Sequence, residues 1–223
     1  MYLSRIKIDT ENRRKIRPLT HLGAYHDWVE KSFPAEIEAG VRRRHLWRID
    51  PLYGELYLMV LSEEKPALKE FSKYGVEGTF RSKSYDHLLA SIQNGQVLRF
   101  RVTANPTYAD PQPGKERGKV YPHVTIEQQR NWLIKKSANA GFEIMKRTND
   151  MIPDAGDQYL FDIVHRDHPG LNRKGNRVVH LSRVTFEGIL KVTDSDVFRQ
   201  TLIQGLGREK AFGMGLMTVL SEV

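Results

Sequence analysis

Hydrophobic and polar residues alternate along this chain in a way that predicts a succession of short strands and helices. Strict alternation over residues 2–9 predicts a strand, because successive side chains of a strand point to opposite faces. Apolar residues recur at helical spacing from about residue 21 to 33, a helix that Thr20 would cap and Pro34 would close. The same periodicities predict the remaining elements of this half: strands near 46–49, 56–61 and 80–84, and a short helix after Pro66.

The same order of elements recurs after Asn94-Gly95. Its predicted members are a strand at 97–104, a helix at 125–140, strands at 142–145, 158–164 and 178–191, a helix at 194–203 and a strand at 216–220. Residues 107–122 are rich in Pro, Gly and charge, and we expect them to form a long loop. Strand–helix–strand–strand–helix–strand in the first half, followed by a similar order with one further strand in the second, predicts an α+β fold of two tandem ferredoxin-like (βαββαβ) domains, 1–94 and 95–223.

The composition limits both the chemistry available to this chain and the compartment in which we expect it. The chain has 223 residues, 39% of them hydrophobic, and no Cys, so it has no disulfide, no thiolate nucleophile and no cysteine metal site. No stretch approaches the roughly 18 apolar residues that a membrane helix requires. The opening segment also lacks the apolar core of a signal peptide. We therefore expect a cytoplasmic protein with no membrane partner.

Basic residues exceed acidic ones, and the formal net charge is +8. An excess of this size favours a polyanionic partner. For any single cluster the alternative is an ordinary solvated surface, but several clusters fall in turns and strand ends, which favours nucleic-acid phosphates over a membrane surface. The clusters are Arg5, Lys7, Arg13, Arg14, Lys15 and Arg17; Arg42, Arg43, Arg44 and Arg48; Lys115, Arg117 and Lys119; and Arg166, Arg173, Lys174, Arg177 and Arg183.

A glycine-rich segment, Gly205–Leu216, lies between the last predicted helix and the last strand. Glycine lets the backbone approach a ligand closely, so backbone amides together with Arg208 and Lys210 are candidates to hold phosphates. The alternative is a tight connection whose glycines serve packing alone. The segment is neither a Walker loop nor a dinucleotide fingerprint, because no Ser or Thr follows a Gly-Lys pair and a strand follows in place of a helix.

The pattern Gly-x-Gly-x-x-Lys-x-x-Gly-x-Gly-Leu before a final strand resembles the signature of the RAMP superfamily of CRISPR proteins. Three further segments resemble the CasE family of type I-E systems: Met1–Ser4 its opening strand, Leu98–Pro106 its "RFRLRANP" strand, and Thr185–Leu190 its "FEG-L" strand. Together with the glycine-rich segment they span the chain in the order of that family.

This resemblance implies two tandem ferredoxin-like (RAMP/RRM-like) domains with a C-terminal glycine-rich loop. The N-terminal domain would carry a catalytic histidine, and the C-terminal domain a basic hairpin. The implied activity is a metal-independent endoribonuclease that cuts precursor CRISPR RNA at the base of the repeat hairpin. Its products would carry a 2′,3′-cyclic phosphate and a 5′-hydroxyl. The implied partners are the repeat RNA and other Cascade subunits, with no small-molecule cofactor.

In the family the catalytic histidine lies on the first helix, commonly in a Tyr-x-x-His pattern. His26 matches the histidine, whereas Gly23 stands at the tyrosine position. Tyr25 or His21 is then a candidate for the second polar group, and Lys31 for steadying the phosphate. Transesterification needs a base for the 2′-hydroxyl or an acid for the leaving 5′-oxygen, and histidine can act as either near neutral pH.

Spacing alone supports a different interpretation of His26. Leu22, His26, Val29 and Phe33 share one helical stripe, so His26 is also placed as a histidine at the edge of the core. If His26 served only packing, the chain would be a non-catalytic RAMP-type subunit that holds RNA without cutting it. The two alternatives make opposite predictions for a variant that lacks His26.

Residues 172–177 read as the turn of a hairpin that projects cations, which in the family enters the groove of the RNA stem. Shape and phosphate contacts should dominate there, because side chains cannot read the narrow major groove of A-form RNA. The alternative is a basic loop. The predicted RNA-binding residues are Arg166, Arg173, Lys174 and Arg177; Lys115, Arg117 and Lys119 of the long loop; and Arg208 and Lys210.

His165 and His168 lie close to Asp162 and Asp167, which is the composition of a metal site. The Pro169-Gly170 pair and the basic run after it favour a loop at an RNA surface. We therefore predict no metal ion.

Overall fold

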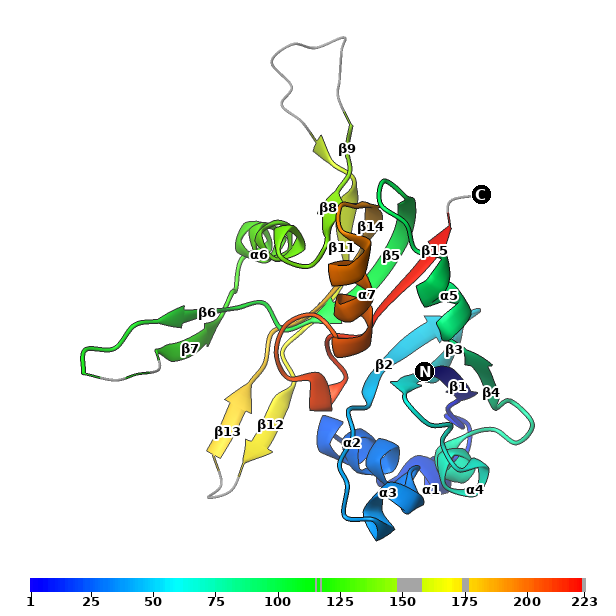
Figure 1. Ribbon diagram of the computed structural model, residues 1–223. Coiled ribbons are helices and arrows are strands. Elements are labelled where there is room, and N and C mark those ends of the chain that lie inside the picture. The colour runs from blue at the N-terminus through cyan, green and yellow to red at the C-terminus, as the bar shows by residue number, and fades with distance from the viewer. Residues whose placement is uncertain (115, 117, 148–157, 174–176, 222–223) are drawn as a thin grey trace. The chain divides into compact units, whose positions relative to one another are not determined.

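The computed structural model describes residues 1–114, 116, 118–147, 158–173 and 177–221, with the backbone alone for 172, 173, 177 and 178. These residues form two compact units. The first unit consists of Met1–Ser91, Pro169–His180 and Glu209–Leu216, and the second of Ile92–His168, Leu181–Arg208 and Met217–Val223. Each unit is built on its own antiparallel sheet (Figure 1).

The sheet of the first unit has the strand order β2-β3-β1-β4. Its strands are β1 (Tyr2–Lys7), β2 (Leu46–Leu52), β3 (Glu55–Ser62) and β4 (Arg81–Ser84). The β2–β3 hairpin turns at Tyr53 and Gly54, whose φ values are 54° and 80°. Two successive positive φ values match the right-handed twist of the flanking strands in a two-residue hairpin loop.

The first unit also contains short helices: α1 (Arg13–Ile16), α2 (Leu22–Lys31), α3 (Pro34–Glu38), α4 (Leu68–Phe71), η1 (Ser72–Tyr74), α5 (Asp86–Ser91) and η2 (Lys210–Phe212). α2 buries Leu22, Trp28 and Val29. Its cap differs from the prediction, because the imidazole Nδ1 of His21, and not Thr20, accepts from the Ala24 N–H. Pro34 also does not close α2; it opens α3, where its missing N–H and fixed φ are tolerated.

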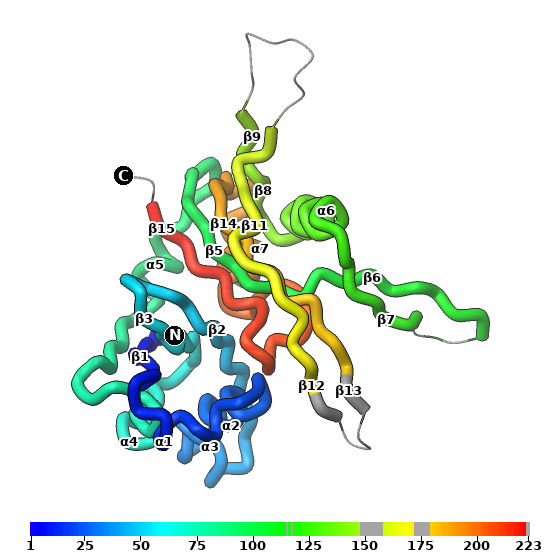
Figure 2. Tube along the Cα trace, turned by 180° about the vertical axis from the view of Figure 1, so that it is seen from behind, coloured from blue at the N-terminus to red at the C-terminus, as the bar shows by residue number. Residues whose placement is uncertain are grey.

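The sheet of the second unit has the order β11-β14-β5-β15, and β8 also pairs with β14. Its strands are β5 (Val97–Ala104), β8 (Phe142–Ile144), β11 (Phe161–Asp167), β14 (Arg183–Val192) and β15 (Met217–Ser221). Figure 2 shows β15 running beside β5 along their antiparallel ladder.

Two helices, α6 (Ile126–Ala138) and α7 (Ser195–Gln204), pack on this second sheet. Trp132 of α6 stacks on Phe186 of β14 with ring centroids 6.3 Å apart. Phe198 of α7 meets Phe142 of β8 edge to face at 5.5 Å. Large aromatic rings therefore join both helices to the sheet, and the predicted α+β class is confirmed.

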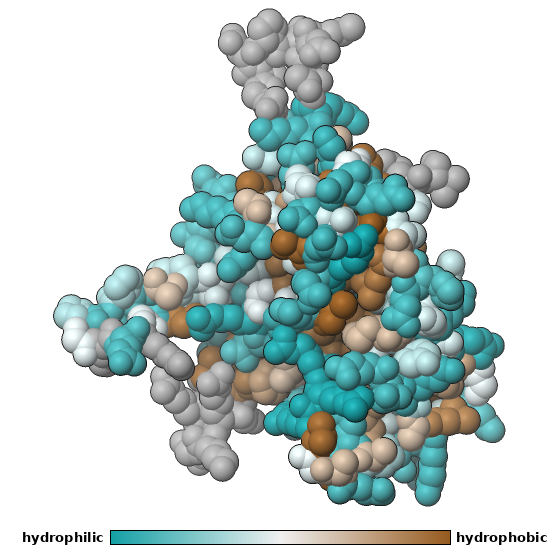
Figure 3. All heavy atoms as spheres, viewed as in Figure 1, coloured by the Kyte–Doolittle hydropathy of each residue, from teal (hydrophilic) through white to brown (hydrophobic). Residues whose placement is uncertain are grey.

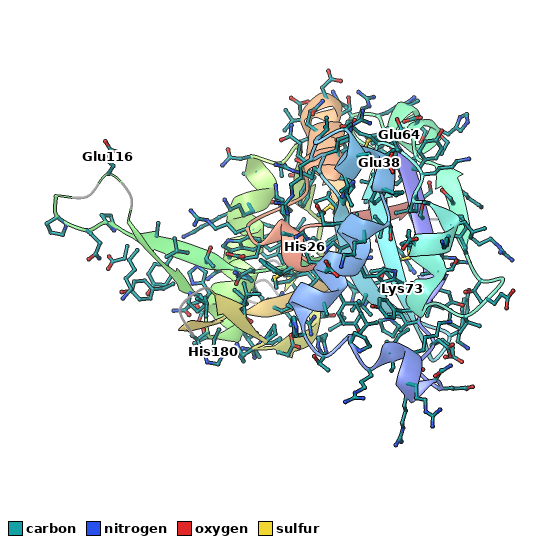
Figure 4. All side chains as sticks on the ribbon, turned by 90° about the horizontal axis from the view of Figure 1, so that it is seen from below. His26, Glu38, Glu64, Lys73, Glu116 and His180 are labelled. Carbon is teal, nitrogen blue, oxygen red and sulfur yellow. The ribbon has the colours of Figure 1, made fainter. Side chains whose placement is uncertain are left out.

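Three paired ribbons extend from the sheets. β6 (Thr107–Asp110) pairs with β7 (Lys119–Pro122), β9 (Lys146–Arg147) with β10 (Gln158–Tyr159), and β12 (Gly170–Arg173) with β13 (Arg177–His180). The loop predicted at 107–122 is therefore wrong, because the chain forms a hairpin there; Figure 4 shows Glu116 at its far end. The hairpin predicted around 172–177 is confirmed by the β12–β13 pairing.

The strand predicted at 178–191 is in fact two strands. β13 ends at His180 and β14 begins at Arg183. Between them the N–H of Ser182 donates to Oδ1 of Asn105 at 3.1 Å, so this N–H does not pair with a neighbouring strand. Hydrophilic side chains cover most of the face shown in Figure 3, as expected for a chain in which 28% of residues are charged. No helix in the described residues is long and apolar enough to cross a membrane.

Candidate active site

His26 lies on α2 within the first unit, with 21% of its side chain exposed. Its ring packs against Phe212 of η2, with centroids 5.7 Å apart. The η2 turn of the glycine-rich segment and α2 therefore meet at this histidine, although they are far apart in sequence (Figure 4).

The two ring nitrogens of His26 have different surroundings. Nε2 lies 3.1 Å from Nη2 of Arg42. Because a guanidinium only donates, Nε2 must accept, and the hydrogen of the neutral ring then lies on Nδ1. Nδ1 is buried and has no hydrogen-bond partner among the described residues; its neighbour is Oε1 of Glu30 at 3.8 Å.

These surroundings set the protonation state of the imidazole. Burial lowers the pKa of His26, the negative charge of Glu30 raises it, and the positive charge of Arg42 lowers it again. The net result is a pKa below the ordinary value for histidine. His26 is therefore neutral at neutral pH, with its lone pair on the nitrogen beside Arg42.

Glu30 connects this histidine to a second, buried one. Its Oε2 accepts from Nε of Arg42 at 3.2 Å, and its Oε1 lies 3.1 Å from Nδ1 of His45. Burial alone would raise the pKa of Glu30, but the hydrogen bond and charge of His45, with the charges of His26 and Arg42, hold that pKa below its ordinary value. Glu30 is therefore an anchored carboxylate.

His45 is fixed from all sides. Its side chain is 2% exposed, and its ring stacks on Phe33 with centroids 3.9 Å apart. Its Nε2 lies 3.3 Å from Oε2 of Glu36, so it stands between two carboxylates. A pocket of about 230 Å³ opens beside this group, lined by Glu30, Phe33, Glu36, Ile37, Gly40, Val41, Arg42 and His45.

Sequence reasoning missed the roles of Glu30, Arg42 and His45. Glu30 stands four positions after His26, the spacing at which side chains on a helix face each other, so that signal was available. Arg42 was visible only as one member of a basic cluster. The contact between Arg42 and His26 spans 16 residues and depends on the path of the chain after α3.

The predicted partners of His26 lie elsewhere on α2. The ring of Tyr25 stacks on Trp47 at 6.1 Å and lies 6.3 Å from that of Trp28. Lys31 forms an ion pair with Asp27 at 2.8 Å, and both side chains are 59% exposed. Lys31 follows His26 by five positions, which at 3.6 residues per turn places it about 140° around the helix.

The glycine-rich segment has a packing role that can be seen directly. Gly213 has φ of 77°, and a Cβ there would lie 2.6 Å from the Trp47 ring. Nε1 of Trp47 also donates to the carbonyl of Ala211 at 3.0 Å. Residue 213 must therefore be glycine, because its backbone lies so close to the Trp47 ring of the first unit that a side chain would clash with it.

The cations of this region differ in their availability. Arg208 is exposed. Lys210 is half-buried, and burial lowers its pKa, with a further contribution from the charge of Arg44. Arg48, part of the basic cluster recognised in the sequence, is buried; it donates to Asp50 at 2.6 and 2.7 Å and to the Leu216 carbonyl at 2.8 Å. Arg48 therefore stabilises the first unit and is not free to bind phosphate.

The other predicted RNA-binding residues are divided between the two units, with Lys119 and Arg166 in the second and Arg173 and Arg177 in the first. Lys119 is exposed on β7, where its ammonium lies 4.9 Å from the centre of the Tyr121 ring. Arg166 on β11 donates to the Val124 carbonyl at 2.7 Å. The backbone of the β12–β13 ribbon carries Arg173 and Arg177. Three predicted residues lie outside the described part of the chain: Lys115, Arg117 and Lys174.

The described residues contain no group of three or more His, Cys, Asp or Glu side chains arranged to hold a metal ion. Two members of the His and Asp cluster considered as a metal site, Asp167 and His165, make other contacts. Asp167 forms an ion pair with Arg183, and His165 lies 3.9 Å from the same carboxylate.

Cationic ribbons, two antiparallel sheets and a neutral histidine beside an arginine fit a protein that handles RNA. The chain belongs to the CRISPR associated protein family, whose model matches residues 1–220. It is 27% identical over 222 residues to the CRISPR-associated endoribonuclease Cse3 of Thermus thermophilus, covering 98% of this chain and 99% of that protein. The family predicted from the sequence motifs is thereby confirmed.

Solved structures of related CRISPR proteins have a similar fold. Cse3 bound to a 19-nt RNA matches with a TM-score of 0.78 and 25% identity, over 99% of this chain and 100% of that one. Thermus thermophilus Cse3 bound to an RNA representing a pre-cleavage complex matches with a TM-score of 0.74 and 24% identity, over 98% of both chains. Cas6e from Escherichia coli shares the fold, with a TM-score of 0.57 and 19% identity over 100% of both chains.

Proposed function

We propose that this chain is an endoribonuclease that cuts precursor CRISPR RNA at the base of its repeat hairpin and then remains bound as a subunit of a Cascade complex. The observation that carries the proposal is His26, neutral and half-buried with an accepting Nε2, in a chain that aligns end to end with an endoribonuclease. Placement in the cytoplasm follows from this role.

The proposed reaction is an internal transesterification. The 2′-oxygen forms a bond to phosphorus, the bond from phosphorus to the 5′-oxygen breaks, and the products are a 2′,3′-cyclic phosphate and a 5′-hydroxyl. One proton leaves the 2′-hydroxyl and one reaches the 5′-oxygen. His26 is suited to one of these transfers, because burial lowers its pKa below the ordinary histidine value and leaves a neutral ring whose Nε2 lone pair can accept a proton.

The remaining site residues have supporting roles in this proposal. Tyr25 shapes the helix face beside Trp47, and Lys31 supplies positive charge for the phosphate once it separates from Asp27. The stem is held by phosphate contacts from Arg166, Arg173, Lys174, Arg177, Lys115, Arg117, Lys119, Arg208 and Lys210. No step requires a metal ion or an organic cofactor.

We also propose that each sheet is one ferredoxin-like unit, with a duplication boundary near residues 94 and 95. Support comes from the strand orders β4-β1-β3-β2 and β15-β5-β14-β11. In each order the first strand of the unit lies between the third and the fourth, which is the arrangement of a split βαβ unit. Segments 169–180 and 209–216 nevertheless belong to the first compact unit.

The proposal is tested with purified protein and end-labelled repeat RNA, in the presence and absence of EDTA. We expect equal cleavage in both conditions and a product whose 3′ end resists phosphatase until acid opens the cyclic phosphate. Loss of activity with the chelator, or a linear 3′-hydroxyl product, would contradict the mechanism. Tight binding without any cleavage would support the alternative, a non-catalytic RNA-binding subunit.

A further inference from the structure

Arg42 occupies the position at His26 that a reacting oxygen must take. Its Nη2 donates to Nε2 at 3.1 Å, and this nitrogen holds the only lone pair in the plane of the neutral ring. The side chain of Arg42 is 72% exposed, so it can move when a ligand arrives. A phosphodiester that brings its 2′- or 5′-oxygen to Nε2 therefore meets this guanidinium first.

The guanidinium is held in place from inside the unit. Glu30 accepts from its Nε at 3.2 Å, while the other carboxylate oxygen of Glu30 is bonded to the buried ring of His45. His45 is in turn fixed by Glu36 and by stacking on Phe33. Of the five N–H donors of a guanidinium, the contacts to Glu30 and His26 engage two, and in the described part of the chain the others remain available for an incoming anion.

We propose that Arg42 is a catalytic residue that contacts the scissile phosphate, and that Glu30 is the positioning residue that aims it. This inference rests on the proposed function and assigns a site residue that the family motifs did not supply. On binding RNA, Arg42 transfers a hydrogen bond from Nε2 of His26 to a non-bridging phosphate oxygen. It stabilises the negative charge that develops on the phosphorane and transfers no proton.

A fork of parallel donors suits this task better than the ammonium of Lys31. Arginine can bind two phosphate oxygens at once, whereas lysine acts as a point charge. Lys31 also lies around the helix from His26 and is paired with Asp27. The geometry therefore gives the direct contact with the scissile phosphate to Arg42 and leaves Lys31 as a more distant positive charge.

Arg42 and Glu30 have opposite electrostatic effects on His26. The positive charge of Arg42 lowers the pKa of His26, and the negative charge of Glu30 raises it. Removing Arg42 should therefore raise the pKa of His26, and neutralising Glu30 should lower it. A purely structural role for the two residues would not produce shifts of opposite sign.

The test compares Arg42→Ala with Arg43→Ala. Arg43 is the adjacent residue, and its side chain pairs with Glu63 at 3.3 Å and Glu64 at 3.4 Å, so its removal deletes the same charge without touching His26. We expect Arg42→Ala to slow single-turnover cleavage by about 10²–10³-fold, the usual effect of losing one transition-state donor. Arg43→Ala should stay within about threefold of the parent, because it loses only long-range charge. Arg42→Lys should fall between them.

A second readout is the titration of the His26 ring, followed by NMR in the free protein. The midpoint should rise in Arg42→Ala and fall in Glu30→Gln. The control is Glu36→Gln, which neutralises the carboxylate on the other side of His45 from Glu30. Arg42 is exposed, so its replacement leaves folding intact and the experiment informative. Equal rates for the Arg42 and Arg43 variants, or midpoints that do not move apart, would reject the inference.

Failure of this inference and failure of the proposed function can be told apart. If the parent protein binds the repeat RNA without cutting it, the proposed function fails. If His26→Ala cuts as fast as the parent, the assignment of His26 as the catalytic residue fails. If His26→Ala is inactive while Arg42→Ala remains fully active, only the role of Arg42 is rejected.

Discussion

At the residue scale, the active site depends on one helical spacing and one long-range contact. His26 and Glu30 face each other because they stand four positions apart on α2. Arg42 reaches the same point through the chain that follows α3. The histidine was predictable from the family motif and the carboxylate from spacing, whereas the arginine required the fold. Gly23, at the position of the usual tyrosine, instead lies against the capping ring of His21.

Gly213 gives a prediction at this scale. Gly213→Ala forces both a positive φ on an L-residue and a Cβ about 2.6 Å from the Trp47 ring. We expect the free energy of unfolding to fall by about 2–4 kcal/mol, combining backbone strain with overpacking. Urea unfolding measures the effect.

Gly40→Ala is the matched control. Gly40 has a similar φ of 64°, but no atom of the described residues lies within 4 Å of the position that a Cβ would take. Only the backbone strain of about 1 kcal/mol therefore remains. Equal losses in the two variants would show that the contact with Trp47 does not explain the glycine at 213.

At the element scale, local patterns predicted the strands of the two sheets and failed where a paired segment has no hydrophobic periodicity. β1 and β5 followed from strict alternation. The β6–β7 ribbon was taken for a loop because its Pro, Gly and charged residues gave no periodicity. Its cross-strand pair of Tyr108 and Tyr121, stacked at 5.7 Å, becomes apparent only once the strands are aligned.

The β6–β7 ribbon also carries a prediction. Replacing residues 111–118 by Asn-Gly keeps a two-residue hairpin turn and removes Lys115 and Arg117. We expect unchanged thermal unfolding and weaker binding to the RNA stem. The slope of log affinity against log salt should fall by about 2, close to one per lost phosphate contact.

Its control removes the same number of cations from the first unit. Lys65→Ala with Lys69→Ala deletes two exposed cations outside the ribbon. This variant should bind the stem with a nearly unchanged salt slope. Equal slopes for the two variants would show that the ribbon makes no special contribution to RNA binding.

At the scale of the whole molecule, each of two units contributes one antiparallel sheet, and sequence order alone does not define the units. The segments 169–180 and 209–216 join the first unit from distant parts of the chain. In this way the glycine-rich segment brings Phe212 against the ring of His26. Hydrophobic periodicity predicted the α+β class, but it carries no information on which unit a connecting segment joins.

The central claim is that His26 carries out the chemistry while binding depends on other residues. The most direct measurement is single-turnover cleavage and equilibrium binding of the same repeat RNA by His26→Ala. His87→Ala, an exposed histidine on α5 of the same unit, is the control. The account predicts that His26→Ala cuts at least about 10³-fold more slowly, as expected for loss of a general acid–base group, with affinity within a few-fold of the parent. Cleavage by His26→Ala at the rate of the His87→Ala control would contradict it.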